Sequence, residues 1–123
     1  MTTVVLGAFQ VSMRGDLANW NVPGSGKGGI GGAMDLAAGG ARVVVVTYHT
    51  TRDRRPKLVP ACTYPLTAPG CVREIVTDLA YLTVEPEGFV LRELAPGVEL
   101  AHVRELTDAP LIVAPDLREM RFA

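Results

Sequence analysis

The hydrophobic positions of this chain fall into short β-branched runs and into stretches with helical spacing. Thr2 to Leu6 is β-branched and apolar, which predicts a strand. The longer run from Ala41 to Tyr48 predicts a second strand, and its continuous β-branched character is typical of burial on both faces, as in a parallel sheet covered by helices. Residues 22–32, with Pro23 and six glycines, predict a loop, and the polar, Pro-containing stretch 50–60 predicts another.

Three stretches are expected to be helical. Residues 31–38 predict a helix after the glycine-rich loop, and Gly39 and Gly40 are its expected stop. Apolar side chains recur at helical spacing in residues 71–79, and residues 98–106 predict a second amphipathic helix. Because strands and helices alternate along the chain, the pattern indicates an α/β fold.

The second half of the chain also predicts a β-hairpin. Its two strands are residues 81–84 and 89–94, joined by a turn at residues 85–88, and Leu111 to Val113 predicts a last short strand. We therefore expect an open, mostly parallel sheet flanked by helices, with the hairpin at one edge. A single domain is expected to span residues 1–123.

Composition and charge narrow the possible functions. Apolar residues make up 48% of the chain and charged residues 20%, which is ordinary for a globular protein. The formal net charge of −1 argues against nucleic acid as a partner, and the basic cluster Arg52, Arg54, Arg55 and Lys57 is expected to be a solvated loop. The longest wholly apolar stretches, such as Val43 to Val46, are too short to cross a bilayer, and the start lacks the features of a signal peptide, so we expect no membrane association.

Cysteine and histidine usage points away from disulfide and metal chemistry. Cys62 and Cys71 form no disulfide framework, which favours a cytoplasmic location. His49 and His102 have no cysteine or carboxylate at a ligand spacing, so no metal site is expected, and His49 is expected to hydrogen-bond to the neighbouring loop. Cys62 has no nearby base and is not expected to be a nucleophile. No permanently bound cofactor is expected.

The glycine-rich loop could hold a ligand. Glycines let a backbone come within hydrogen-bond reach of a bound group, and the start of the following helix offers free N–H groups suited to a phosphate or a thioester oxyanion. The G-x-G-x-x-G spacing is present, but a buried strand before it and an acid about twenty residues on are both missing, which disfavours a dinucleotide site. Close packing of the loop against the sheet remains the alternative.

Gln10 and Ser12 follow the first predicted strand, at the end where open α/β sheets collect their ligands. The Gln10 amide can donate and accept at once, which suits a carboxylate or a thioester carbonyl; capping of the following loop is the alternative. Asp16 is expected to be a turn or helix-capping residue rather than an acid or base.

Several sequence blocks together resemble one known family. The run from Gly7 to Trp20 (GAFQVSMRGDLANW) resembles the β subunit of the class I 3-oxoacid CoA-transferases. The resemblance covers nearly the whole chain and continues in GGIGGAMD at residues 28–35, CTYPLT at 62–67, TDLA at 77–80, ELAPG at 93–97 and LIVAPDL at 111–117.

This resemblance implies a transfer of CoA between an acyl-CoA, such as succinyl-CoA, and a 3-oxo acid through a glutamyl-CoA thioester. CoA would be a substrate, and 3-oxoadipate fits the 57–67 stretch better than acetoacetate. The residues expected to bind substrate and CoA are Gln10, Ser12, Asn19, Gly29, Gly31, Gly32 and Ala33.

The chain departs from the family in one respect. The nucleophilic glutamate of the family lies in a Ser-Glu-Asn-Gly motif upstream of the GAFQ block, and no such motif occurs in these 123 residues. We therefore expect a portion truncated at its N-terminus, with no catalytic residue of its own, that is inactive without a CoA-transferase α subunit, a missing N-terminal half, or both. An oligomer is expected. The alternative is a non-catalytic remnant that binds CoA or assembles with other subunits.

Overall fold

The computed structural model describes residues 3–18 and 42–120. In this part of the chain the strands and the helix follow one another in the order β1 (Thr3–Leu6), β2 (Gln10–Ser12), β3 (Leu17–Ala18), β4 (Arg42–Val46), β5 (Leu58–Val59), β6 (Val72–Val76), β7 (Ala80–Glu85), β8 (Gly88–Leu94), α2 (Leu100–Glu105) and β9 (Leu111–Glu119).

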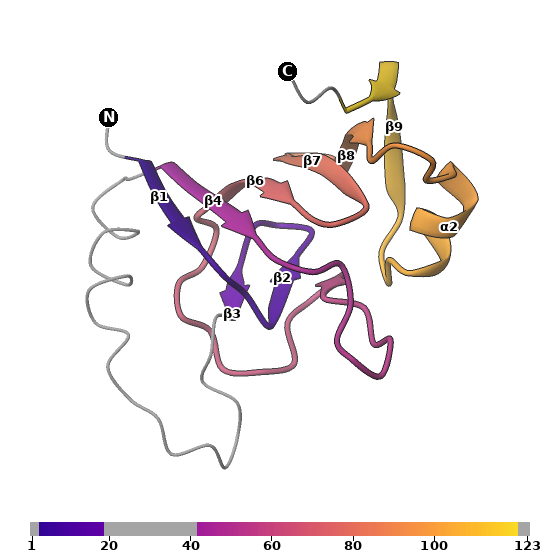
Figure 1. The fold of residues 1–123 in the computed structure, drawn as a ribbon. Coiled ribbons are helices and arrows are strands. Elements are labelled where there is room, and N and C mark those ends of the chain that lie inside the picture. The colour runs from indigo at the N-terminus through magenta and orange to yellow at the C-terminus, as the bar shows by residue number, and fades with distance from the viewer. Residues whose placement is uncertain (1–2, 19–41, 121–123) are drawn as a thin grey trace.

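Six strands form one large sheet in the order β1-β4-β6-β7-β8-β9 (Figure 1). The pairs β1–β4, β4–β6 and β8–β9 are parallel, whereas β6–β7 and β7–β8 are antiparallel. The sheet is therefore mixed and mostly parallel, which confirms the predicted α/β class.

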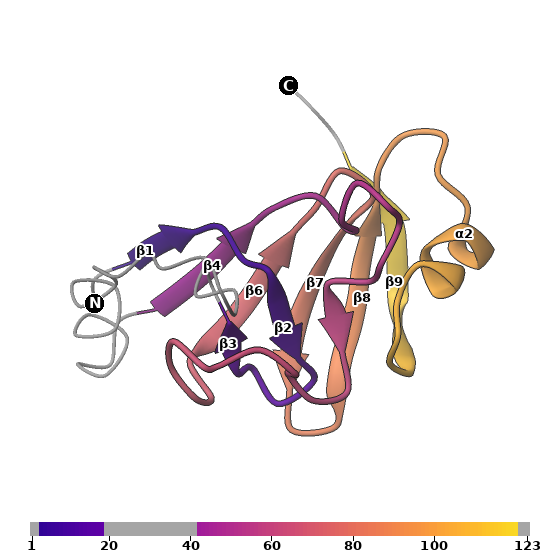
Figure 2. The same ribbon diagram turned by 90° about the horizontal axis from the view of Figure 1, so that it is seen from below.

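A small sheet, missed by the sequence analysis, lies against one face of the large one (Figure 2). It has the order β3-β2-β5, with β2 antiparallel to β3 and parallel to β5. Its strands are only two or three residues long, too short to show a periodic pattern. β5 occupies part of the stretch 50–60 that was predicted to be a loop.

The hydrophobic core lies between the two sheets. Val11, Leu17 and Leu58 of the small sheet are fully buried, and they join fully buried residues of the large sheet in one cluster. Val103 of α2 belongs to the same cluster, so the helix packs on this inner side. Full burial of each Leu or Val side chain stabilises the fold by about 1.5–3 kcal/mol.

The prediction of a helix at residues 71–79 is wrong, because β6 occupies this segment. Val43 of β4 pairs with Val72, but the next residue, Val44, pairs with Glu74, so Arg73 is an extra residue in a β-bulge. The bulge moves the alternation by one position, and the two fully buried residues of β6, Val72 and Ile75, come three residues apart. This spacing imitates that of a helix.

Three further expectations need correction or confirmation. The β7–β8 hairpin is confirmed, but it lies inside the sheet and not at an edge, because β9 pairs with the outer side of β8. β9 is also longer than predicted, and its position at the edge accommodates Pro115. In β4, Val43 and Val45 are fully buried whereas Val46 is 50% exposed, so this strand is not buried on both faces.

Among the helices, α2 confirms the element predicted at residues 98–106, while the helix predicted at 31–38 falls outside the described residues. α2 is the one helix in the described part of the chain. In residues 3–18 and 42–120, no helix has the length and apolar character needed to span a membrane.

Candidate functional site at the carboxyl edge of the sheet

The carboxyl ends of β1, β4 and β6 meet at one edge of the large sheet, because the three strands are parallel neighbours. The segments that leave them are held together by hydrogen bonds. Thr47 donates its amide to the carbonyl of Val76 at 3.1 Å and its hydroxyl to the carbonyl of Ala8 at 3.4 Å. The amide of His49 donates to Oδ1 of Asp78 at 2.8 Å. This edge therefore combines three strand ends in a fixed geometry.

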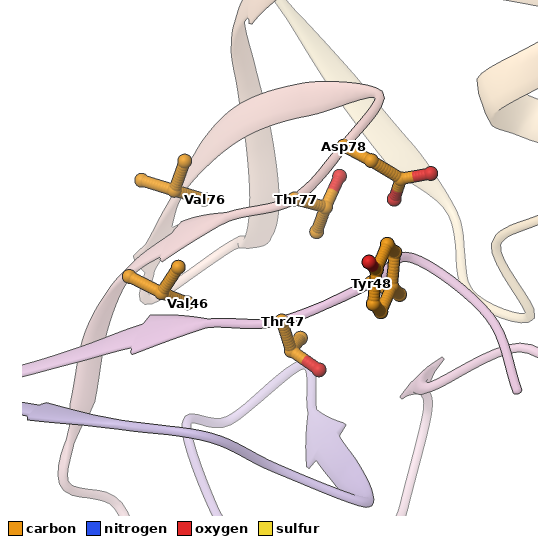
Figure 3. A pocket seen from close by; sticks show the side chains of 6 residues that line it. All are labelled: Val46, Thr47, Tyr48, Val76, Thr77 and Asp78. Atoms are coloured by element: carbon orange, nitrogen blue, oxygen red, sulfur yellow. The ribbon is translucent and has the colours of Figure 1, made fainter.

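A hollow of about 480 Å³ opens at the ends of β4 and β6 (Figure 3). Its walls are Val46, Thr47, Tyr48, Val76, Thr77 and Asp78. Val46 and Val76 are register partners and give the hollow an apolar side, while the exposed Tyr48 and Asp78 stand at its end. A second hollow of about 370 Å³ shares Tyr48 and Asp78 and continues to Arg52. Together their walls combine an apolar side with charged groups of both signs, Asp78 and Arg52.

His49 is buried beside this hollow and ties three elements together. Its Nε2 lies 2.7 Å from the hydroxyl of Thr107, which itself donates to the carbonyl of Val103 at 2.7 Å. Nε2 must therefore carry the proton and donate it to Thr107. Nδ1 lies 2.9 Å from the hydroxyl of Thr77, closer than the 3.5 Å from that hydroxyl to the carbonyl of Ala80, so Nδ1 accepts. The ring is thus held in its neutral form.

The electrostatic environment of His49 agrees with this assignment. Burial lowers the pKa of His49 from 6.5 to about 4, and the nearby carboxylate of Asp78 opposes this effect only in part. A neutral imidazole that is bonded on both sides has no free nitrogen for proton transfer or metal binding. His49 is a hydrogen-bonding residue, as expected, but its ring binds Thr77 and Thr107, 28 and 58 residues away, and not the neighbouring loop. The bond to Thr107 brings the end of α2 close to the hollow.

Lys57 departs from the solvated-loop prediction for the basic cluster. Arg52, Arg54 and Arg55 are exposed, but Lys57 is partly buried and its Nζ donates to Oγ1 of Thr47 at 2.9 Å. Burial lowers the pKa of Lys57, and Asp78 acts in the opposite direction. The sequence signal that could have separated Lys57 from the arginines is its place directly before the buried pair of β5. A cation therefore stands at the carboxyl edge.

Gln10, an expected ligand contact, is engaged with a distant loop. Its Oε1 accepts the amides of Thr63 and Tyr64 at 2.8 and 3.1 Å, and its Nε2 donates to the hydroxyl of Thr63 at 2.8 Å. Gln10 thus fastens the 62–67 segment to β2. The Nε2 group carries two N–H donors, and the one that does not face Thr63 is the atom with which Gln10 could still reach a ligand.

Ser12 and Asp16 form a closed turn. Ser12 is fully buried, and its hydroxyl donates to Oδ2 of Asp16 at 2.9 Å. The hydroxyl oxygen of Ser12 in turn accepts the amides of Arg14 and Asp16. The other carboxylate oxygen of Asp16 accepts the amide of Gly70 at 2.8 Å. In this arrangement Ser12 offers no accessible atom to a ligand, and Asp16 is the turn residue that was expected.

The remaining expected site residues cannot be placed. Asn19, Gly29, Gly31, Gly32 and Ala33 lie outside the described residues. Gln10 and Ser12 both lie in β2, but the turn that holds Ser12 lies at the amino end of β6, where the carbonyl of Gly15 accepts the amides of Cys71 and Val72. The glycine-rich block stays a prediction.

Gly7, at the carboxyl end of β1, also suggests that another group approaches the backbone here. It follows β1 directly, its backbone is not in the left-handed region, and a Cβ built on it would meet no atom of the described residues within 4 Å. Neither backbone geometry nor packing in the described structure therefore requires glycine at this position. Such a glycine permits close approach of another backbone or of a ligand.

The described residues were also searched for a reactive thiol and for a metal-binding cluster. Burial raises the pKa of the Cys62 thiol to about 11, so the thiol stays protonated at neutral pH, in agreement with the expectation that it is no nucleophile. Residues 3–18 and 42–120 contain no group of three or more His, Cys, Asp or Glu side chains placed to hold a metal ion.

The chain thus has an open, mostly parallel sheet of the α/β class, with a hollow at the carboxyl ends of its strands, the place where such sheets collect ligands. Residues 1–106 match the sequence profile of the family described as Coenzyme A transferase, and the chain belongs to this family.

Relatives with assigned names agree with the family assignment. The chain is 50% identical over 109 residues to the B subunit of 3-oxoadipate CoA-transferase from Pseudomonas putida, a match that covers 88% of this chain and 51% of that protein. It is 51% identical over 107 residues to the beta subunit of a probable coenzyme A transferase from Bacillus subtilis, covering 87% and 49%. It is 44% identical over 119 residues to the human mitochondrial succinyl-CoA:3-ketoacid coenzyme A transferase 2, covering 95% and 23%. The chain thus spans about half the length of the two bacterial relatives.

Solved structures show the same fold. The acyl-CoA transferase YdiF of Escherichia coli O157:H7 superimposes with a TM-score of 0.81 at 20% identity, over 98% of this chain and 28% of that one. The decarboxylase AibA/AibB superimposes with a TM-score of 0.79 at 24% identity, over 100% and 52%. At this identity the likeness concerns the fold alone.

Proposed function

We propose that this chain is the β-type portion of a CoA-transferase that moves CoA between an acyl-CoA, such as succinyl-CoA, and a 3-oxo acid. The observation that carries the proposal is the 50% identity to the B subunit of 3-oxoadipate CoA-transferase over 109 residues. The same relative favours 3-oxoadipate over acetoacetate as the acceptor acid. The proposal includes an α subunit as partner and a cytoplasmic location.

The proposed reaction proceeds through two acyl exchanges on a carboxylate. A glutamate attacks the acyl-CoA thioester, CoA leaves as the thiolate, and the resulting anhydride is attacked by that thiolate to give a glutamyl-CoA thioester and the free acid. The 3-oxo acid then reverses these steps and leaves as its CoA ester. Covalent catalysis divides one slow exchange into easier steps, and donors to the oxyanion stabilise each tetrahedral intermediate.

The roles we assign to this chain are binding and electrostatic. Backbone N–H groups at Gly29, Gly31, Gly32 and Ala33 would face the oxyanion, and the amide of Asn19 would contact the substrate. Gln10 would act with its remaining N–H, whereas Ser12 would act only by holding its turn. The Nζ of Lys57, next to Thr47, adds a positive charge at an edge where carboxylates must collect.

The nucleophile is proposed to come from outside these 123 residues, since the Ser-Glu-Asn-Gly motif does not occur in them. The test is reconstitution. The purified chain is assayed with succinyl-CoA and 3-oxoadipate alone, and then with an α subunit and a companion polypeptide that carries the motif. We expect no 3-oxoadipyl-CoA from the chain alone and turnover from the assembly. Replacement of the companion's motif glutamate by alanine should abolish turnover.

A borohydride trap makes the test specific. The reagent reduces a glutamyl-CoA thioester, and peptide mass analysis then locates the modified residue. Modification of an acid within this chain, or robust turnover by the chain alone, would overturn the proposal.

A further inference from the structure

A third hollow lies at the other end of the large sheet from the candidate site. Its volume is about 610 Å³, and its walls are Arg14, Arg73, Val84, Glu85 and Pro86. We call it the arginine hollow. It adjoins the amino end of β6, whereas the hollow of the candidate site opens at the carboxyl end of the same strand. A space of this size can hold a small organic molecule.

The turn that carries Arg14 is held firmly. The hydroxyl oxygen of Ser12 accepts the Arg14 amide at 3.1 Å, and the carbonyl of Ser12 accepts the Gly15 amide at 2.9 Å. The carbonyl of Gly15 in turn accepts the amide of Val72 at 2.9 Å. The backbone beside Arg14 is therefore fastened to the residue directly before Arg73.

Arg73 lines the hollow from the β-bulge in β6. It is the extra residue between Val72 and Glu74, which pair with consecutive residues of β4. A bulge turns a side chain away from the regular alternation of a strand. Nη1 of Arg73 donates to the carbonyl of Gly70 at 3.1 Å, which restrains the guanidinium. Two arginines from distant parts of the sequence thus line one hollow.

The end of the β7–β8 hairpin forms the remaining wall, through Val84, Glu85 and Pro86. The turn that follows β2 rests on this hairpin, since a Cβ on Gly88 would lie only 3.2 Å from Cε of Met13 (Figure 2). The arginine hollow therefore lies between three segments that contact one another, and its shape is set before any ligand arrives.

The charge around the hollow is positive. In the described part of the chain, ion pairs to carboxylates are formed by Arg42, Arg55, Arg92 and Arg118. Arg14 and Arg73 form none with the described residues, although both are exposed. Glu85 is the acid of the wall, and its Oε2 lies 3.4 Å from Nη2 of Arg92. Both carboxylate oxygens of Asp16, beside the turn, already accept hydrogen bonds.

We propose that the arginine hollow binds a small dianion, whose charged part is a phosphate group or a pair of carboxylates. A guanidinium presents its N–H donors as a planar fork that matches two oxygens of either group. Val84 and Pro86 add an apolar wall for the carbon part of such a molecule. The site is separate from the candidate site, and the proposal does not depend on the function proposed above.

The test uses the full 123-residue chain and two probes, inorganic phosphate and succinate, both of which are dianions at pH 8. Titration calorimetry measures the binding of each probe to the wild type, Arg14→Gln and Arg73→Gln. Arg104→Gln is the matched control, because Arg104 is an exposed arginine of α2 and its replacement removes the same charge away from the hollow. Urea unfolding without a probe verifies that each variant is folded.

We expect at least one probe to bind the wild type and Arg104→Gln alike, and to bind Arg14→Gln and Arg73→Gln more weakly by at least about tenfold, since each loses hydrogen bonds between charged groups. The probe that binds identifies the charged part of the ligand. Glu85→Gln removes the acid of the wall and should bind the same probe more tightly than the wild type.

A second measurement makes the result specific to the folded site. The probe should raise the urea midpoint of the wild type and of Arg104→Gln, and should leave the midpoints of Arg14→Gln and Arg73→Gln unchanged. Absence of binding by both probes would overturn the proposal, and the two arginines would then be solvated side chains only. Equal weakening in Arg104→Gln and the two wall variants would also overturn it, because the attraction would then come from the charge of the whole chain.

Discussion

The neutral, buried imidazole of His49 makes the stability of this protein dependent on pH. Burial lowers the pKa of His49 from 6.5 to about 4, so between these values the unfolded chain binds a proton that the folded chain does not. Stability is therefore fully present above pH 6.5 and is lost as the pH falls toward 4. The opposite sign would require a raised pKa in the folded state.

The magnitude follows from the two pKa values. Each pH unit between them corresponds to about 1.4 kcal/mol, so the whole window amounts to about 3 kcal/mol of unfolding free energy. A change from pH 7 to pH 5 covers part of the window and should cost about 2 kcal/mol. The side chain is only 1% exposed, so solvent screening does not reduce this value substantially.

Urea unfolding followed by circular dichroism at pH 7 and pH 5 measures this loss. His49→Gln removes the titrating ring, so its unfolding free energy should fall by about 2 kcal/mol less than that of the wild type between the two pH values. The variant should be less stable than the wild type at pH 7, because the bonds to Thr77 and Thr107 are disturbed. Arg104→Gln is the control, since Arg104 lies at an exposed position of α2 and its replacement should leave the loss between the two pH values as in the wild type. Equal losses in the wild type and His49→Gln would refute the reasoning.

Three other substitutions or reactions test particular features of the structure. Gly15 has a φ of +83°, and a Cβ on it would lie 2.7 Å from the carbonyl oxygen of Val72. Gly15→Ala should therefore lower the unfolding free energy by about 2 kcal/mol in urea titrations. An unchanged unfolding midpoint would contradict this. Cys62, with a thiol pKa of about 11, should react with iodoacetamide at pH 8 about a hundredfold more slowly than a free thiol, and urea should remove the difference in a peptide mass assay. In the reconstituted enzyme, Lys57→Met should lower kcat/KM about tenfold. The control Arg55→Met, at an exposed position, should leave kcat/KM unchanged. Equal rates for Lys57→Met and the wild type would exclude a role for the Lys57 charge.

Strong local sequence patterns were sufficient to predict several strands and the helix. The β-branched runs predicted β1 and β4, and the turn at residues 85–88 between two apolar stretches predicted the β7–β8 hairpin. Helical spacing after Pro96 and Gly97 predicted α2. In each case neighbouring residues alone contain the information, because period and turn chemistry are local properties.

The sequence also carried the family resemblance, in blocks that the match to the Coenzyme A transferase family confirms. It could not supply the roles of individual side chains in those blocks. Gln10 was expected either to contact a ligand or to cap the following loop, and its amide holds the backbone of Thr63 and Tyr64, more than fifty residues away. Such a contact depends on how two distant segments fold together.

Only the tertiary structure decided where the strands sit and which charges face the site. A β-bulge at Arg73 gave β6 the spacing of a helix, and β9 beside β8 moved the hairpin from the edge to the interior. Lys57 looked like its arginine neighbours until the fold set it against Thr47. Sequence alone determines local periodicity and ancestry, whereas register, strand order and partial burial arise from contacts between residues far apart in the chain, which no local pattern encodes.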